Sequence, residues 1–207
     1  MKIKHVLDDM NGLFDTDRLV SFIFVTDGFH RTPEEVRGVV MHRCNDAAAE
    51  PFVYLFGCDF SQQLQEIESV PDYMINRQGS LEQMKQLADT WLFNQLGETK
   101  PIFISSGYYE WTADICKNLE WHKDDDAIDL RQLYSAYTNV ADIPAYSALE
   151  NESLRAFFNR FPKPPKRFGL KAIEDAIRGD YISIGCNPVC RARNTSSQAL
   201  TMLMKEL

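Results

Sequence analysis

The run at residues 19–25 (LVSFIFV) constrains the fold more than any other feature of this sequence. Residues with β-branched or aromatic side chains dominate the run, and these residue types favour strands over helices. The run is apolar at consecutive rather than alternating positions, which is typical of a strand that is buried on both faces. We therefore expect a buried strand here, and the rest of the fold has to cover it.

Two flanking segments predict an antiparallel start to the sheet. Residues 2–7 (KIKHVL) indicate a short first strand that ends in acidic residues, and residues 36–44 indicate a third strand. Three closely spaced strands with short connections favour a meander. The next segment, 46–79, has no regular pattern and is interrupted by Pro51 and Pro71. Its aromatic residues could form an apolar dimer surface, although filling of the core is their more usual role. They are Phe52, Tyr54, Phe56, Phe60 and Tyr73.

From residue 80 onward, helical patterns alternate with single short strands. Ser80 and Gln83 have the spacing of a capping box, and an apolar stripe follows at helical spacing. The stripe consists of Leu81, Met84, Leu87, Ala88, Trp91 and Leu92. Further strands are expected at 101–104 and 127–130, and further helices at 110–119, 131–137, 170–177 and from about 189 to the end. The last helix carries Ala192, Thr195, Ala199 and Leu203 on one face. This order predicts a mixed-sheet α/β fold.

Composition sets the remaining limits. The chain has 207 residues, of which 44% are hydrophobic, and this suits one α/β domain spanning 1–207. No apolar run is long enough to cross a membrane. Five scattered cysteines indicate free thiols in a reducing compartment, so we expect a soluble cytoplasmic protein with no membrane partner. Cys186 and Cys190 could share a helix face, but a zinc site would need two further ligands, and His122 is the only histidine in the second half.

Three segments resemble the DEDD-type 3′–5′ exonucleases of the ribonuclease H-like superfamily. Residues 5–10 (HVLDDM) resemble the family's apolar strand that ends in Asp-x-Glu, and residues 104–110 (ISSGYYE) resemble its strand followed by an aromatic-Asp pair that opens a helix. Residues 186–203 (CNPVCRARNTSSQALTML) are similar to its closing His-x(4)-Asp-Ala-x-Asn-Thr helix, which Gly169-Leu-Lys-Ala precedes as in the family. The resemblance covers nearly the whole chain. It implies a ribonuclease H-like mixed sheet, three antiparallel strands and then parallel strands, flanked by helices.

The resemblance also implies a two-metal hydrolytic site. In the family, four carboxylates gather two divalent cations that clamp the attacking and leaving oxygens of a phosphodiester. Mg²⁺ or Mn²⁺ would be the cofactor if the protein is active, because hard oxygen ligands suit these ions. Asp8, Asp9 and Glu110 are then the expected metal ligands, and Asp8, Glu110 and Arg191 the expected catalytic positions.

Several of these positions depart from the family pattern. The family's glutamate is replaced by Met10, or by Asn11 if the frame starts at Asp9, and its histidine by Cys186. Arg191 stands in place of the final aspartate, and a guanidinium cannot bind a cation. We therefore expect an impaired two-metal site. Arg191 could instead contact a phosphate, or could pair with an acid of the old site.

The charge distribution suggests where a nucleic acid could bind. The net charge is −8, so no global field attracts a polyanion. The C-terminal third is nevertheless locally basic, and single-stranded DNA or RNA is the expected ligand of this patch. Its candidate contact residues are Lys163, Lys166, Arg167, Lys171 and Arg193. The alternative partner is a protein, with the fold acting as a catalytically inactive interaction module. The sequence leaves the oligomeric state open.

One competing enzyme class remains. Residues 9–16 (DMNGLFDT) resemble the opening motif of haloacid-dehalogenase-like phosphohydrolases, with Asp9 as the nucleophile and Asn11 in place of the general acid. Ser105 or Ser106 would supply that family's second motif, but its late acidic pair is missing. A serine-hydrolase triad at Ser105 or Ser106 would lack the G-x-S-x-G elbow, and no nucleotide-binding glycine motif is present.

Overall fold

The computed structural model describes residues 7, 15–26, 33–46, 48–57, 73–105, 127–139, 154–161 and 188–204. The strands are β1 (Leu19–Thr26), β2 (Val36–Arg43), β3 (Phe52–Phe56), β4 (Tyr73–Asn76), β5 (Ile102–Ser105) and β6 (Ala127–Asp129). The helices are α3 (Leu81–Leu96), α5 (Leu130–Asn139), α6 (Leu154–Asn159) and α8 (Pro188–Met204), with short 3₁₀ turns at Thr16–Arg18 and Pro33–Glu35.

Within the described residues, the strands form one six-stranded mixed sheet in the order β4-β3-β2-β1-β5-β6. β2 runs antiparallel to both β1 and β3, whereas β1, β5 and β6 run parallel to one another, and β4 is parallel to β3. The expected α/β class and the succession of antiparallel and then parallel strands are confirmed. The expected composition of the antiparallel trio is wrong, because β1, β2 and β3 form it. Leu7 has helical backbone, so the strand expected at 2–7 does not extend to its last residue, and 2–6 lie outside the described residues.

β1 is the strand that the apolar run predicted, and it lies in the interior of the sheet. Alternate side chains of a strand point to opposite faces. Val20 and Phe22 contribute to the core on the α3 side, and Ile23 to the core on the α8 side. The ring of Phe22 makes an edge-on contact with Phe103 of β5 at 5.2 Å between centroids. Both faces of β1 therefore need a helical cover, which explains why its sequence does not alternate.

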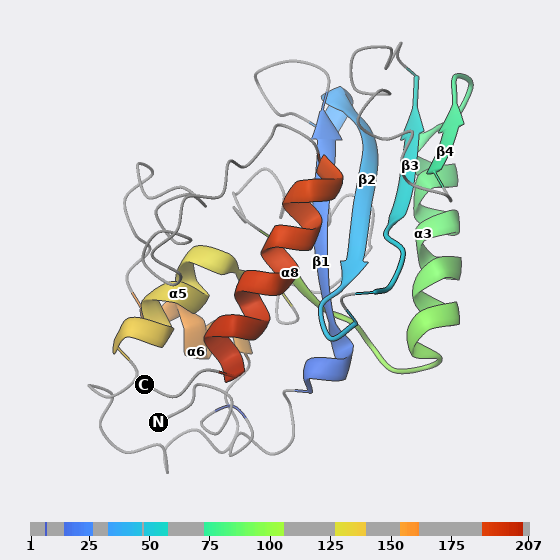
Figure 1. The fold of residues 1–207 in the computed structure, drawn as a ribbon. Helices are drawn as coiled ribbons and strands as arrows, with labels where there is room; N and C mark the ends of the chain where they lie inside the picture. The colour runs from blue at the N-terminus through green and yellow to red at the C-terminus, as the bar shows by residue number, and fades with distance from the viewer. Residues whose placement is uncertain are drawn as a thin grey trace.

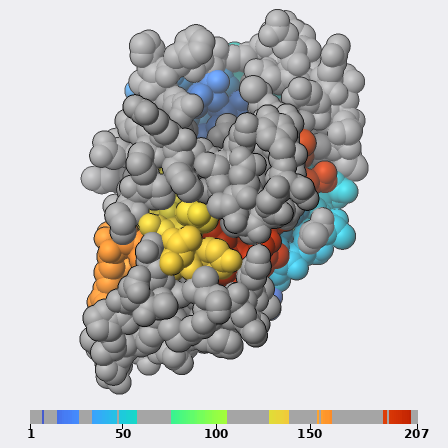
Figure 2. All heavy atoms as spheres, turned by 60° about the vertical axis from the view of Figure 1, so that its left-hand side comes forward, coloured from blue at the N-terminus to red at the C-terminus, as the bar shows by residue number. Residues whose placement is uncertain are grey.

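Helices cover the two faces of the sheet (Figure 1). α8 packs across β1, β2 and β5, with α5 beside it and α6 next to α5 and β6. α3 packs on β2 and β3 and buries the opposite face. In Figure 2, α5 and α6 reach the surface, and part of α8 is visible beyond α5. In the described part of the chain, no helix is long and apolar enough to span a bilayer.

The predicted helix at 81–92 is α3. Its first turn is capped by Ser80, whose hydroxyl accepts the Gln83 N–H at 3.2 Å. Met84 lies at the centre of the buried stripe and is fully enclosed. The inclusion of Leu87 in this stripe was wrong, because its side chain is 37% exposed. The helix ends at Gly97, whose φ of 64° lies in the left-handed region that only glycine adopts readily.

β3 and β4 were not predicted from the sequence. Phe52, Tyr54 and Phe56 of β3 are buried in the core on the α3 side, so these aromatic residues fill the core and do not form a dimer surface. The side chains of Phe60 and Tyr73 lie outside the described residues. β3 lies so close to β2 that a Cβ placed on Gly38 would clash with the Tyr54 carbonyl oxygen.

The C-terminal expectations agree with the structure where it describes them. The strand at 127–130 is β6, the helix at 131–137 lies within α5, and the last helix is α8. Its predicted face is buried at all four positions. α6 was not predicted, and the expected helices at 110–119 and 170–177 lie outside the described residues.

Candidate functional site

The carboxyl ends of the parallel strands bring two polar side chains together. Ser105 is the last residue of β5 and is the register partner of Asp129, the last residue of β6. Both side chains are buried. This edge is where open α/β sheets place ligands, and the sequence predicted chemistry at the end of β5. The polar group that the structure adds there is Asp129.

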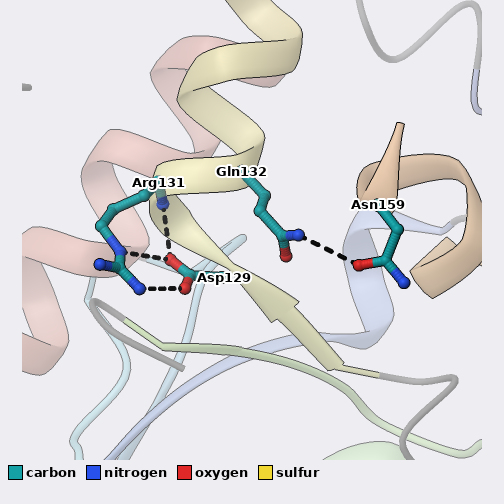
Figure 3. Close-up of polar contacts among 4 residues, drawn as sticks. All are labelled: Asp129, Arg131, Gln132 and Asn159. Carbon is teal, nitrogen blue, oxygen red and sulfur yellow. Dashed lines mark hydrogen bonds and ion pairs between the residues drawn. The ribbon is translucent and has the colours of Figure 1, made fainter. Parts of the chain in front are cut away.

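Asp129 is held by Arg131 at the start of α5 (Figure 3). Its Oδ1 accepts the Arg131 backbone N–H at 2.9 Å and Nε at 3.1 Å, and its Oδ2 accepts Nη2 at 2.7 Å. The carboxylate therefore caps the helix and forms a two-point ion pair with the same residue. Both side chains are more than 90% buried, so water screens the pair very little.

This pairing restricts what Asp129 can do chemically. Both of its oxygens accept hydrogen bonds from Arg131, and the positive charge of this guanidinium opposes the binding of a metal cation at Asp129. Next to the pair, Gln132 Nε2 donates to Asn159 Oδ1 at 3.2 Å and joins α5 to α6 (Figure 3). The geometry is that of a fixed structural junction beside the strand ends.

A second polar group lies between β1, β2 and α8. Ser196 of α8 is within 2.9 Å of both the His42 Nδ1 and the Ser21 Oγ. Ser21 in turn donates to the Ala192 carbonyl oxygen at 2.9 Å. Side chains from two strands and one helix are therefore linked in one chain of hydrogen bonds. Their separation along the sequence reaches 175 residues.

Burial shifts the ionisation of two groups here. Burial lowers the pKa of His42, and the positive charge of Arg193 lowers it further, whereas the backbone of Ala49 and the charges of Asp46 and Glu50 oppose this shift. Burial raises the pKa of the Cys44 thiol to about 12, against smaller opposing effects of hydrogen bonds with Ser196 and Ser21. Both groups are therefore neutral near pH 7, as expected for ionisable groups in a low-dielectric environment.

Most of the site residues predicted from the sequence lie outside the part of the chain that the structure describes. Asp8, Asp9 and Glu110 lie outside the described residues, and so do Lys163, Lys166, Arg167 and Lys171. Arg191 belongs to α8, but its side chain is not described. Arg193 is described. Its side chain is 46% exposed, and its guanidinium pairs with Glu50 at 3.6 Å.

The described residues do not provide a site for Mg²⁺ or Mn²⁺. No three His, Cys, Asp or Glu side chains gather there within reach of one ion. Asp129, the acid at the strand ends, is already bound by Arg131. These ions need several hard oxygen ligands together. The metal ligands named from the sequence therefore stay a prediction about residues outside the described part.

Sequence reasoning missed the two groups that the structure does assemble. His42 was expected in a strand, which is confirmed, but nothing in the sequence indicated its contact with Ser196. Asp129 and Arg131 fall at the predicted strand–helix junction, where an aspartate directly before the first helical residue is a capping signal. Comparison of the chain with protein families, with curated proteins and with solved structures gave no match.

Proposed function

We propose that this protein is a divergent member of the ribonuclease H-like group of DEDD-type exonucleases, and that it binds a nucleic-acid strand without efficient two-metal hydrolysis. The architecture that the resemblance implies begins with three antiparallel strands and continues with parallel ones. The observed sheet has this succession, and a C-terminal helix packs across its first strand. This agreement supports the fold assignment.

The proposal that efficient hydrolysis is lost rests on the composition of β1. The family's Asp-x-Glu motif ends its first strand, and residues two apart on a strand point to the same face. Here the first strand of the antiparallel trio is β1, so Asp8 does not belong to that strand. The residues of β1 that contact α8 or share a core with it are Leu19, Ser21, Ile23 and Val25. None of them can bind a cation as a carboxylate would, so this strand lacks the anionic pair that two metals require.

The proposal of nucleic-acid binding rests on the basic C-terminal third. Arg193 projects from α8 and is partly exposed, and among the described residues its ion-pair partner is the half-exposed Glu50. Exposed pairs of this kind contribute little to stability, so a phosphate can compete for Arg193 at small cost. The predicted contacts at 163–171 precede the same helix in the sequence.

The phosphohydrolase alternative receives no support from the fold. It needs a nucleophilic aspartate directly after a strand, yet Leu7, two residues before Asp9, has helical backbone. Asp9 itself lies outside the described residues.

A binding experiment with matched variants tests the proposal. Fluorescently labelled single-stranded DNA and RNA oligonucleotides should bind in EDTA, with affinity that falls steeply as salt increases. Lys166→Gln/Arg167→Gln should weaken binding and reduce the salt dependence by up to about two counterions. Arg77→Gln/Lys85→Gln removes the same charges near α3 and should leave binding unchanged.

Two results would contradict the proposal in different ways. Shortening of the oligonucleotide from its 3′ end in Mn²⁺, abolished by Asp8→Ala, would show that hydrolysis is retained. Failure of every oligonucleotide to bind at low salt would refute nucleic-acid binding and favour a protein partner. The oligomeric state would be read from the same samples by light scattering.

A further inference from the structure

The interface between β2 and α8 contains a histidine whose two ring nitrogens have very different surroundings. His42 is only 2% exposed. Its Nδ1 faces the Ser196 hydroxyl, whereas its Nε2 is fully enclosed and has no hydrogen-bond partner among the described residues. A buried polar atom without a partner is rare in folded proteins and calls for a physical explanation.

One assignment of protons satisfies all the other groups of this chain. If His42 Nδ1 carries the hydrogen, it donates to Ser196 Oγ, Ser196 donates to Ser21 Oγ, and Ser21 donates to the Ala192 carbonyl oxygen. Each hydroxyl then donates once and accepts once. The neutral ring leaves a lone pair on Nε2, which tolerates an apolar enclosure better than a charged N–H would. The folded arrangement is thus built around the uncharged ring.

The charges around His42 are divided between the helix and the sheet. Arg193 on α8 disfavours the protonated ring, whereas Asp46 and Glu50, in the segment that joins β2 to β3, favour it. Cys44, at the end of β2, is neutral, and Ser21 is the β1 residue of the group. A proton on His42 is therefore attracted by groups on the sheet side of the interface and repelled by the cation on the helix side.

We propose that His42 couples the docking of α8 to pH, so that protonation of its ring in mildly acid solution loosens α8 from β1 and β2. Among the described residues Nε2 has no hydrogen-bond partner, and the pull of the Ala49 backbone on a protonated ring does not offset its burial. The positive ring and Arg193 also compete for Glu50, which lies 3.6 Å from Arg193. Separation of α8 from the sheet relieves both conflicts, because water then reaches the ring and Arg193 moves away. α3 lies on the opposite face of the sheet and takes no part in this coupling to pH. This inference does not depend on the proposed function.

Hydrogen exchange with mass spectrometry tests the proposal on the full chain. After correction for the intrinsic exchange rates, the protection of α8 amides against hydrogen exchange should fall between about pH 7.5 and pH 5. The fall should be about tenfold for each pH unit between the pKa of His42 in the unfolded state and its lower pKa in the folded state. α3 is the internal reference, and its protection should change less. His42→Asn keeps an N–H for Ser196 but cannot take up a proton, so its α8 protection should not depend on pH.

Two exposed charges provide a test that does not rely on a variant of the buried residue. Arg193→Gln removes the repulsion, brings the folded-state pKa of His42 closer to its unfolded value, and should therefore reduce the loss of α8 protection in acid. Glu50→Gln removes an attraction, lowers the folded-state pKa further, and should increase that loss. Opposite changes in the two variants support the proposal. Equal loss of protection in α3 and α8, or losses of α8 protection that do not change in opposite directions in the two variants, would overturn it.

Discussion

Removal of the Asp129 carboxylate should destabilise this protein far more than loss of an ordinary ion pair. Asp129 forms a charged pair with Arg131 in a site where both side chains are more than 90% buried. Breaking such a pair from one side costs about 3–5 kcal/mol, because the remaining charge loses its partner inside the protein. The carboxylate also accepts a backbone N–H of the first turn of α5, and loss of such a cap costs about 1 kcal/mol. Asp129→Ala should therefore lower the free energy of unfolding by about 4–6 kcal/mol.

Two further variants separate the charge from the cap. Asp129→Asn keeps an oxygen acceptor for the helix end but removes the charge, so it should lose about 3–5 kcal/mol. Asp129→Asn/Arg131→Met removes both charges and should be more stable than Asp129→Asn alone, because no buried cation is left without its counter-ion. Urea unfolding followed by circular dichroism measures all three variants against the unaltered protein. Losses below about 1 kcal/mol in every variant are typical of exposed pairs and would refute this reasoning.

Three smaller perturbations test other parts of the fold. Ser80→Ala should lower the free energy of unfolding by about 1 kcal/mol, and Ser80→Asp, which restores a cap, by much less in the same urea assay. Gly38→Ala should cost about 1–3 kcal/mol or more through its clash with β3, and more than Gly97→Ala, where a Cβ meets no atom within 4 Å and only the backbone is strained. In native protein near pH 8, iodoacetamide should modify exposed Cys190 and spare Cys44, whose buried thiol has a pKa raised to about 12; rapid modification of Cys44 would contradict its burial. Because the raised pKa favours the neutral thiol, the stability that Cys44 contributes should be lost as pH rises from 9 towards 12.

The elements that could be predicted are those marked by a residue pattern within one short segment of the sequence. β1 was found because six of the seven residues at 19–25 are apolar and need cover on both faces, and α3 because a cap precedes a helical stripe. β3 escaped because all its residues are buried and Pro51 directly precedes it, so neither alternation nor clear flanking turns marked it as a strand. α6, with six residues, is too short for helical periodicity to be recognised.

The polar sites were harder to predict because they depend on three-dimensional register. Asp129 and Ser105 are neighbours only because β5 and β6 are parallel and pair in one particular register. Ser196 meets His42 only because α8 crosses β2, over a separation of 154 residues. Composition and spacing carry no information on such contacts. The predicted catalytic carboxylates were inferred from a resemblance, and among the described residues the antiparallel strands begin with β1.

The long separation between β1 and α8 has a consequence for synthesis on the ribosome. The contact between Ser21 and the Ala192 carbonyl spans 171 residues, so the central strand emerges well before the helix that covers one of its faces. At about 5–20 residues per second, this face stays uncovered by α8 for roughly 10–30 s. During that time Ile23 and its neighbours are open to premature association. A nascent chain stalled before residue 188 should therefore bind an Hsp70-type chaperone, and a chain that has released α8 should bind it less.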